Sequence, residues 1–220
     1  MRFRDARPTR RGFLAGVLLS AAALTTRGVF AEELKRTAHV EEGPFYPDKL
    51  PLDTDNDLLI VNDSITPAVG EVTHLSGRLR DSSGDPIRDA LIEIWQVDST
   101  GTYLRARGSH PGRFDGNFQG FGRFLTGSTG EYYFRTIKPV AYSGRPAPHI
   151  HFAVKLKGRE KWTTQLFIKG DPGNARDFLY RGLTAREKDS VTAEFLPLNK
   201  SRIGELTTRF DLVMGLTPET

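Results

Sequence analysis

The chain has 220 residues, enough for one domain with its own hydrophobic core, and it has no cysteine, which excludes disulfides, thiolate metal sites and a thiol nucleophile. Residues 1–31 carry six Arg and one Asp; removing them from 31 basic and 27 acidic residues leaves 25 basic and 26 acidic ones. The formal net charge of +4 therefore belongs to this first segment, and the rest of the chain indicates no nucleic-acid-binding surface.

Residues 1–31 are typical of an export signal. An Arg-rich start precedes an apolar run from Phe13 to Leu24, and the segment ends at a small residue, Ala31. The stretch TRRGFL at residues 9–14 is similar to a twin-arginine signal, although an ordinary secretory signal or an uncleaved anchor is the alternative. We expect a twin-arginine signal peptide, export to the periplasm or the outside of the cell, and no membrane association after its cleavage.

After the export signal, the sequence is loop-like up to about residue 70 and strand-like beyond it. Residues 32–70 are dense in Pro, Asp and Asn, which predicts an extended N-terminal segment. After it come short runs rich in β-branched and aromatic residues, separated by turn residues, and these predict strands. The runs lie within residues 71–81, 90–98, 124–137, 162–173 and 205–215, and short helices are expected only within residues 177–195.

Many short strands with a turn about every ten residues predict an all-β fold. We expect an antiparallel β-sandwich with short helices over residues 71–220, preceded by the long loop segment, and not a parallel α/β sheet.

The stretch YSGRPAPHIHFAV, residues 142–154, places two histidines in a strand-like run. Alternate residues of a strand point to the same side about 6.5 to 7 Å apart, so Ile150 and Phe152 share an apolar face while His149 and His151 share the other. Two interpretations are open: polar residues on a solvent face, or two ligands of one metal ion.

A metal ion would need further ligands. The chain has no H-E-x-x-H motif, and His39, His74 and His110 lie in loop-like or strand-edge surroundings. Tyr103 and Tyr142 are better placed, and phenolate with neutral imidazole suits a ferric ion. Because a free phenol titrates near about 10, a highly charged cation must drive its deprotonation.

Four runs, IEIWQVDSTGTY, GFGRFLTGSTGEYYFRTIKPVAY, PHIHF and TQLFIKGDP, occur in this order. Together they resemble the intradiol ring-cleavage dioxygenases, closest to the protocatechuate 3,4-dioxygenase beta branch, over about residues 40–215. The resemblance implies a β-sandwich around one Fe(III) ion held by two Tyr and two His. By motif match these ligands are Tyr103, Tyr142, His149 and His151.

The resemblance also implies an activity. A small aromatic diol of the catechol type is cleaved between its hydroxyls with O2 to a muconate-type dicarboxylate, and Tyr142 is the ligand that the substrate displaces. Arg145 resembles a residue that stabilises charge on the substrate ring, but it stands one residue further from His149 than in the family pattern, which leaves its direction open. Gln165 matches a glutamine that lines the site, and Pro44 and Tyr46 resemble a segment that folds over the pocket.

A different class of protein also fits part of the sequence. The runs LSGRLRDSSGDPIRDALIEIWQ and TGSTGEYYFRT suit a transthyretin-like or carboxypeptidase-regulatory-like β-sandwich, a binding module without catalysis. Such a module gives no reason for the four Tyr and His residues to coexist. A dioxygenase fold that has lost turnover is a third alternative, and the identity of the catechol and a possible homo-oligomer are left open.

Overall fold

The computed structural model describes residues 33–61, 65–103 and 114–215. The expected export signal and His110 lie outside these ranges. Residues from Leu34 onward form one compact unit, which holds every element described below. A helix with the length and apolar character needed to cross a bilayer is absent from the described ranges.

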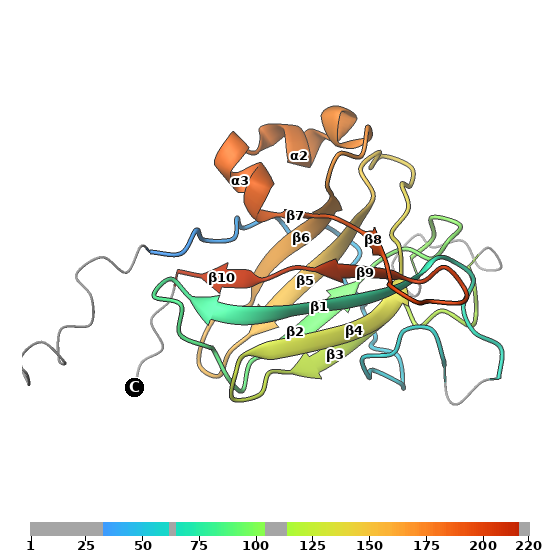
Figure 1. Cartoon of the computed structure of the whole chain (residues 1–220), viewed down its shortest axis with the longest axis horizontal. Coiled ribbons are helices and arrows are strands. Elements are labelled where there is room, and N and C mark those ends of the chain that lie inside the picture. Colours follow the sequence, from blue (N-terminus) through green and yellow to red (C-terminus); the bar gives the residue numbers. More distant parts are fainter. Residues whose placement is uncertain (1–32, 62–64, 104–113, 216–220) are drawn as a thin grey trace, which may run out of the picture. The chain divides into compact units, whose positions relative to one another are not determined.

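Two five-stranded sheets lie face to face in this unit (Figure 1). The first sheet contains β1 (Val72–Asp81), β4 (Glu131–Ile137), β8 (Leu196–Pro197), β9 (Leu206–Arg209) and β10 (Leu212–Met214). The second contains, in spatial order, β3 (Phe121–Leu125), β2 (Leu91–Trp95), β5 (His149–Lys155), β6 (Trp162–Ile168) and β7 (Thr192–Ala193). The predicted β-sandwich is therefore confirmed.

Strand directions differ in part from the antiparallel expectation. β1 pairs with β4 in antiparallel fashion but with β9 and β10 in parallel, and β6 pairs in parallel with β7. A parallel neighbour requires a crossover connection. Residues 169–191, which contain the helices, supply that crossover between β6 and β7, so the sheets are mixed.

The expected helical segment, residues 177–195, contains two short helices, and a 3-10 turn precedes it. The turn is η1 (Asn174–Arg176), the helices are α2 (Phe178–Gly182) and α3 (Ala185–Ser190), and all three lie beyond the β6–β7 edge in Figure 1. Asp177 caps α2 by accepting from the backbone N–H groups of Leu179 and Tyr180. Thr184 and Glu187 form a reciprocal capping box that starts α3.

The main core fills the space between the sheets. Alternation along β1 and β4 directs Leu75 and Phe134 inward, where they meet Ile92, Ile150 and Phe152 of the second sheet, and all five are fully buried. This apolar face of β5 is the one that the sequence predicts.

The opposite face of the second sheet is also covered. Thr163 Oγ1 on β6, which pairs with Ala153 of this face, donates to the carbonyl oxygen of Val40 at 2.9 Å and holds the N-terminal segment against the sheet. Further along this segment, Phe45 and Tyr46 pack against a second buried cluster that contains Trp95, Tyr103, Phe121 and Ala153. β2 and β5 therefore have buried side chains on both faces.

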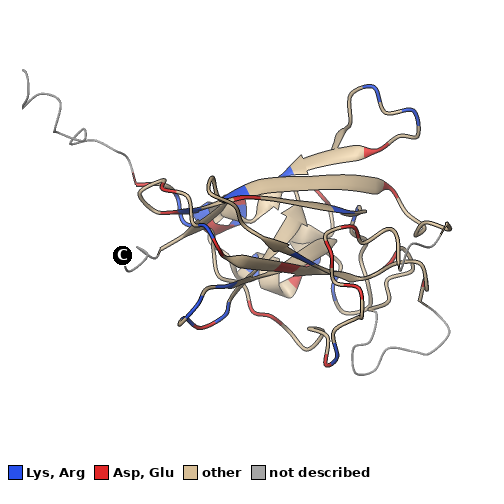
Figure 2. Ribbon diagram, turned by 90° about the horizontal axis from the view of Figure 1, so that it is seen from below, with Lys and Arg blue, Asp and Glu red and all other residues tan. Residues whose placement is uncertain are grey.

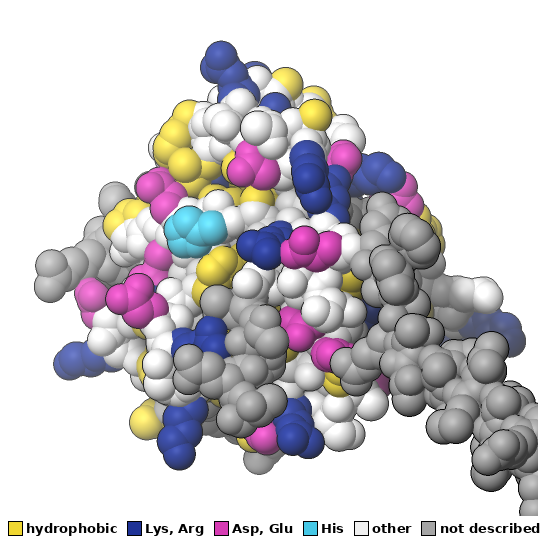
Figure 3. All heavy atoms as spheres, turned by 90° about the vertical axis from the view of Figure 1, so that its left-hand side faces the viewer, with side chains coloured by type: hydrophobic (Ala, Val, Ile, Leu, Met, Phe, Trp, Pro, Cys, Tyr) yellow, Lys and Arg dark blue, Asp and Glu magenta, His cyan; other side chains and the backbone are white. Residues whose placement is uncertain are grey.

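The outer surface carries charges of both signs. Figure 2 shows Lys and Arg positions interspersed with Asp and Glu positions along the strands and loops. On the face seen in Figure 3, small hydrophobic groups also lie between the charged side chains. This mixture agrees with the balanced charge of the chain after residue 31.

Candidate metal centre

His149 and His151 lie on β5 and point away from the main core, as the alternation predicts. They are nevertheless 2% and 1% exposed, because the N-terminal segment and the loops cover this face. Their rings are 4.8 Å apart between centroids. The solvent-face interpretation of the pair is therefore wrong, and the two imidazoles share one buried space.

Two tyrosines from different loops join the histidines. Tyr103 follows β2, and its phenol oxygen lies 2.8 Å from Nε2 of His151 and 3.4 Å from the phenol oxygen of Tyr142. Tyr142 follows β4, and its ring centroid is 5.5 Å from that of His149. The fold thus gathers all four residues that the sequence singled out as possible metal ligands.

Each imidazole has a nitrogen without a partner. Nδ1 of His149 lies 2.7 Å from the carbonyl oxygen of Ala147, and because a carbonyl only accepts, this nitrogen carries the proton. Nε2 of His149 is then a lone-pair donor, and neither it nor Nδ1 of His151 has a hydrogen-bond partner in the described part of the chain. In metal-binding histidines, the ring nitrogen that does not bind the metal typically donates a hydrogen bond, as Nδ1 of His149 does here.

Burial determines the protonation state of the four groups. Burial and the neighbouring Arg145 lower the pKa of His149 to about 4, and burial with the same arginine and His149 lowers the pKa of His151 well below its usual value. Burial also raises the pKa of Tyr103 well above 10 and raises that of Tyr142. At neutral pH the histidines are neutral donors, whereas the phenols ionise only beside a strong cation.

These residues fit a metal ion. Donor atoms that each lie about 2.0 to 2.1 Å from one metal are roughly 3 Å from one another, and the oxygen and nitrogen atoms of Tyr103, Tyr142 and His151 have that spacing at 2.8 and 3.4 Å. Elsewhere in the described ranges, no group of three or more His, Cys, Asp and Glu residues is placed to hold a metal. Two nitrogen and two phenol oxygen donors favour a hard, highly charged cation such as Fe(III).

Arg145 lies beside the four rings. Tyr142 and Arg145 exchange backbone hydrogen bonds of 3.1 and 2.9 Å, and Gly144 between them has a φ of 84°. This tight turn places Arg145 directly beside Tyr142. The guanidinium donates from Nε to Asp177 Oδ2 at 2.7 Å and from Nη2 to Gln165 Oε1 at 2.8 Å. The side chain is thereby held against the site.

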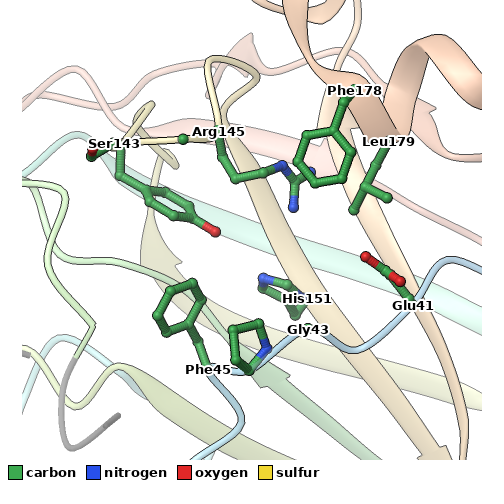
Figure 4. Close-up of a pocket in the computed structure, with 11 residues that line it drawn as sticks. Glu41, Gly43, Phe45, Ser143, Arg145, His151, Phe178 and Leu179 are labelled. Carbon is green, nitrogen blue, oxygen red and sulfur yellow. The ribbon is translucent and has the colours of Figure 1, made fainter. Parts of the chain in front are cut away.

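A cavity of about 220 Å³ opens onto these residues (Figure 4). Tyr142, Arg145 and His151 form its polar wall. Figure 4 shows Phe178 and Leu179 from α2 on one side and Phe45 from the N-terminal segment on the other. Pro44 also lines the cavity, as the resemblance of this segment implies.

The structure adds aromatic contacts that sequence patterns did not identify. The ring of Phe45 stacks on Tyr103 at 4.6 Å with an interplanar angle of 12°. Trp95 stacks on His151 at 4.8 Å and 11°. Both contacts join residues from distant parts of the chain, so the only available signal was the placement of Phe45 in the Pro-rich segment before Tyr46.

A buried carboxylate anchors that segment. Tyr46 donates its hydroxyl to Glu93 Oε2 at 2.8 Å, and Glu93 is completely buried. Arg123 and Lys155 pair with the same carboxylate at 2.8 and 2.9 Å. Because Phe45 precedes Tyr46, this ion-pair network also fixes the aromatic wall of the cavity.

Comparison with known proteins finds relatives over the part of the chain that forms the two sheets and the candidate centre. A family model described as Dioxygenase matches residues 41–215, well over half of the sequence. Protocatechuate 3,4-dioxygenase beta chain from Burkholderia cepacia is 35% identical over 156 residues, which are 66% of this chain and 65% of that one. Catechol 1,2-dioxygenase 2 from Acinetobacter lwoffii is 30% identical over 161 residues, 66% of this chain and 55% of that one. The chain thus spans less than two thirds of the length of these relatives.

Solved structures share the fold. The dioxygenase domain of a carbohydrate-binding fusion protein from Streptomyces sp. SirexAA-E is 26% identical, with a TM-score of 0.63 over 83% of this chain and 99% of that one. Catechol 1,2-dioxygenase from Acinetobacter sp. ADP1 is 21% identical, with a TM-score of 0.63 over 96% of this chain and 82% of that one. These two likenesses extend over most of the chain and are likenesses of fold.

Proposed function

The chain belongs to the intradiol ring-cleavage dioxygenase family, and on that basis we propose that it cleaves a catechol-type aromatic diol between its two hydroxyls. Both atoms of O2 enter the product, which is a muconate-type dicarboxylate, so no further reductant is needed. The observation that carries the proposal is the convergence of Tyr103, Tyr142, His149 and His151 in one buried space.

Four donor atoms would hold the metal. These are Nε2 of His149, Nε2 of His151 and the phenol oxygens of Tyr103 and Tyr142. Fe(III) in this position supplies Lewis-acid and redox chemistry that makes the diol reactive toward O2. The hydrogen bond from His149 Nδ1 to the Ala147 carbonyl oxygen keeps the Nε2 lone pair directed into the site.

Tyr142 differs from Tyr103 in its surroundings. Tyr103 is 6% exposed and lies under Phe45, whereas Tyr142 lines the cavity and is only partly buried. Tyr142 is therefore the phenol that an incoming diol can reach. Because burial raises its pKa, its phenolate oxygen is basic enough to take a proton from one hydroxyl of the diol.

Arg145 provides fixed positive charge beside the substrate. Asp177 and Gln165 each hold one nitrogen of the guanidinium, so the group needs no reorganisation when negative charge develops on the ring. The side chains of Phe45 and Phe178 border the same cavity and exclude water from the reacting atoms.

The test is a product analysis. The iron-loaded protein is mixed with a panel of catechols in labelled O2, and oxygen uptake and product mass are followed. The proposal predicts a dicarboxylate with two labelled oxygen atoms. Ring opening beside the hydroxyls would contradict intradiol cleavage, and binding without oxygen uptake would favour the binding-module alternative.

We also propose that residues 1–31 direct export by the twin-arginine route. The Arg pair within residues 9–14 and the apolar run after it support this placement. Cell fractionation tests it: the protein is expected outside the cytoplasm, and the double substitution Arg10→Lys, Arg11→Lys should retain it inside. Equal export of both forms would contradict the route.

A further inference from the structure

Charge in the cavity bears on which catechol fits. Among the described residues that line it, Glu41 and Arg145 are the ones with Asp, Glu, Lys or Arg side chains. His151 and Tyr142 also line it, but as ligands of the proposed metal they belong to that centre. Apart from the metal centre, one carboxylate and one guanidinium are therefore the charges that a substituent of the substrate meets in the described lining.

The charge of Arg145 is already compensated. Its Nε lies 2.7 Å from Oδ2 of Asp177, which is completely buried, and its Nη2 donates to Gln165. The other oxygen of Asp177 accepts the first backbone N–H groups of α2, so this carboxylate cannot turn away. A substituent near Arg145 meets a guanidinium whose attraction for an anion is reduced by the carboxylate of Asp177 behind it.

Glu41 has no such partner. Its side chain is exposed, and it forms no hydrogen bond or ion pair with the described residues. Figure 4 shows its carboxylate directed toward the cavity beneath Leu179. Its backbone carbonyl accepts from Nε2 of Gln165 at 3.0 Å, which fixes this residue beside the Arg145 pair. Of the two charged side chains in this lining, Glu41 is therefore the one without a counter-charge among the described residues.

Resting on the proposed function, we propose that the substrates are single-ring catechols without a ring carboxylate, and that Glu41 rejects the carboxylated ones. An anionic substituent would lie near an uncompensated carboxylate in a partly enclosed site, where like charges repel more strongly than in water. A cavity of about 220 Å³ is also smaller than the roughly 300 Å³ lower limit of drug-sized pockets, which favours one ring. Glu41 is then a specificity-determining residue of this chain.

The preference separates this chain from one relative by name. Protocatechuate is a catechol with a ring carboxylate, and it names the substrate of the Burkholderia cepacia relative that is 35% identical to this chain. Sequence identity alone would therefore suggest protocatechuate as the substrate of this chain. The uncompensated carboxylate of Glu41 points instead to neutral or cationic catechols.

A matched set of substrates tests the proposal. The iron-loaded full chain is assayed with 4-methylcatechol, 3,4-dihydroxybenzoate and 3,4-dihydroxybenzylamine, which differ mainly in the charge of one substituent. We expect kcat/KM for the benzoate to be at least about tenfold below that for 4-methylcatechol. Glu41→Gln should raise the benzoate to 4-methylcatechol ratio roughly tenfold, and Glu41→Lys should raise it further. The bond from Gln165 is to the Glu41 backbone and survives both substitutions.

The neighbouring acid gives the control. Glu42 forms an ion pair with Lys161 and does not belong to the cavity lining, so Glu42→Gln should leave the ratio as it is in the parent protein. A parent protein that prefers the benzoate, or a Glu41→Gln variant with an unchanged ratio, overturns the proposal.

Anaerobic binding of the same three compounds keeps the two proposals apart. If anaerobic binding gives the expected affinity ratio but the assay in the presence of O2 gives no product, the proposed reaction fails and the charge preference stands. If product forms and the ratio is reversed, the preference fails and the reaction stands.

Discussion

The phenol oxygen of Tyr103 lies 2.8 Å from Nε2 of His151, although the two residues are 48 positions apart. Strand register explains the approach: Trp95 pairs directly with His151 between β2 and β5, and Tyr103 follows β2 by a short loop. A tight turn around the Asp98 side chain shapes that loop, since Asp98 Oδ1 accepts the backbone N–H groups of Thr100 and Thr102. Two donor atoms of the candidate centre are thus positioned by backbone structure alone.

Replacing this phenol should weaken metal binding. In Tyr103→Phe one of the four donor atoms is lost, so we expect iron affinity to fall at least roughly tenfold and the visible absorption to shift. Metal analysis after dialysis and absorption spectra measure both effects.

Tyr133→Phe is the matched control, because its hydroxyl also lies near a histidine nitrogen, at 2.6 Å from His74, but on the first sheet. Equal iron loss in both variants would contradict the assignment of Tyr103.

The stability of the metal-free protein should fall in acid. The pKa of His149 is lowered to about 4, mainly by burial, from an ordinary value of 6.5. Above pH 6.5 neither state is protonated there; as pH falls from 6.5 toward 4, the unfolded state takes up the proton and the folded state does not. From His149 alone, the free energy of unfolding should drop by about 2 kcal/mol between about pH 7 and about pH 5. Urea unfolding at both pH values measures this drop. In His149→Gln, the free energy of unfolding should fall by about 2 kcal/mol less over the same pH range. Identical pH dependence in the variant would refute the cause.

A glycine outside the site should also be sensitive. Cβ of an alanine at position 173 would lie 2.0 Å from the Pro146 carbonyl oxygen, so Gly173→Ala must displace the loop between Arg145 and Ala147. We expect a loss of about 1 to 3 kcal/mol of stability and weaker iron binding. Thermal unfolding and metal analysis are the measurements. Gly127→Ala, whose Cβ meets no atom within 4 Å, should change stability by less than about 0.5 kcal/mol. A Gly173→Ala protein as stable as this control would show that the loop is not constrained there.

The ion pair of Arg145 and Asp177 should matter more than pairs at the surface. Asp177→Asn keeps a side chain that can cap α2 but leaves a guanidinium that is 7% exposed without its counter-charge, which costs about 3 to 5 kcal/mol. Asp189→Asn breaks the exposed pair with Lys35 and should cost less than about 1 kcal/mol. Chemical denaturation compares the two, and similar losses would mean that the buried pair adds no special stability.

Much of this architecture was predictable because its signals are local. Alternation of apolar residues and turn residues between them placed the strands, and Leu206, Thr208, Phe210 and Leu212 are buried as their spacing indicates. The two histidines share a face for the same reason. Their burial was not predictable, because Tyr103 and Tyr142, which pack against them, come from other loops, and Phe45, which contacts both tyrosines, comes from a segment about a hundred positions earlier in the sequence.

The charged partners in the site depend on the fold in the same way. Asp177 caps the short helix α2 with one carboxylate oxygen and holds Arg145 with the other, and no local sequence pattern indicates this second contact. The additional residue before His149 left the direction of Arg145 open in the sequence, and the contacts of its guanidinium with Asp177 and Gln165 fix that direction in the fold. Parallel pairing of β1 with β9 likewise depends on long-range topology that no local pattern contains.

The central claim is that Tyr103, Tyr142, His149 and His151 bind one ferric ion together. Its most direct test is the visible absorption spectrum of the protein after reconstitution with one equivalent of Fe(III) and removal of unbound metal. The account predicts a red to burgundy protein, with a charge-transfer band from tyrosinate to iron that changes in Tyr103→Phe and in Tyr142→Phe. A colourless protein that retains one equivalent of iron would contradict it.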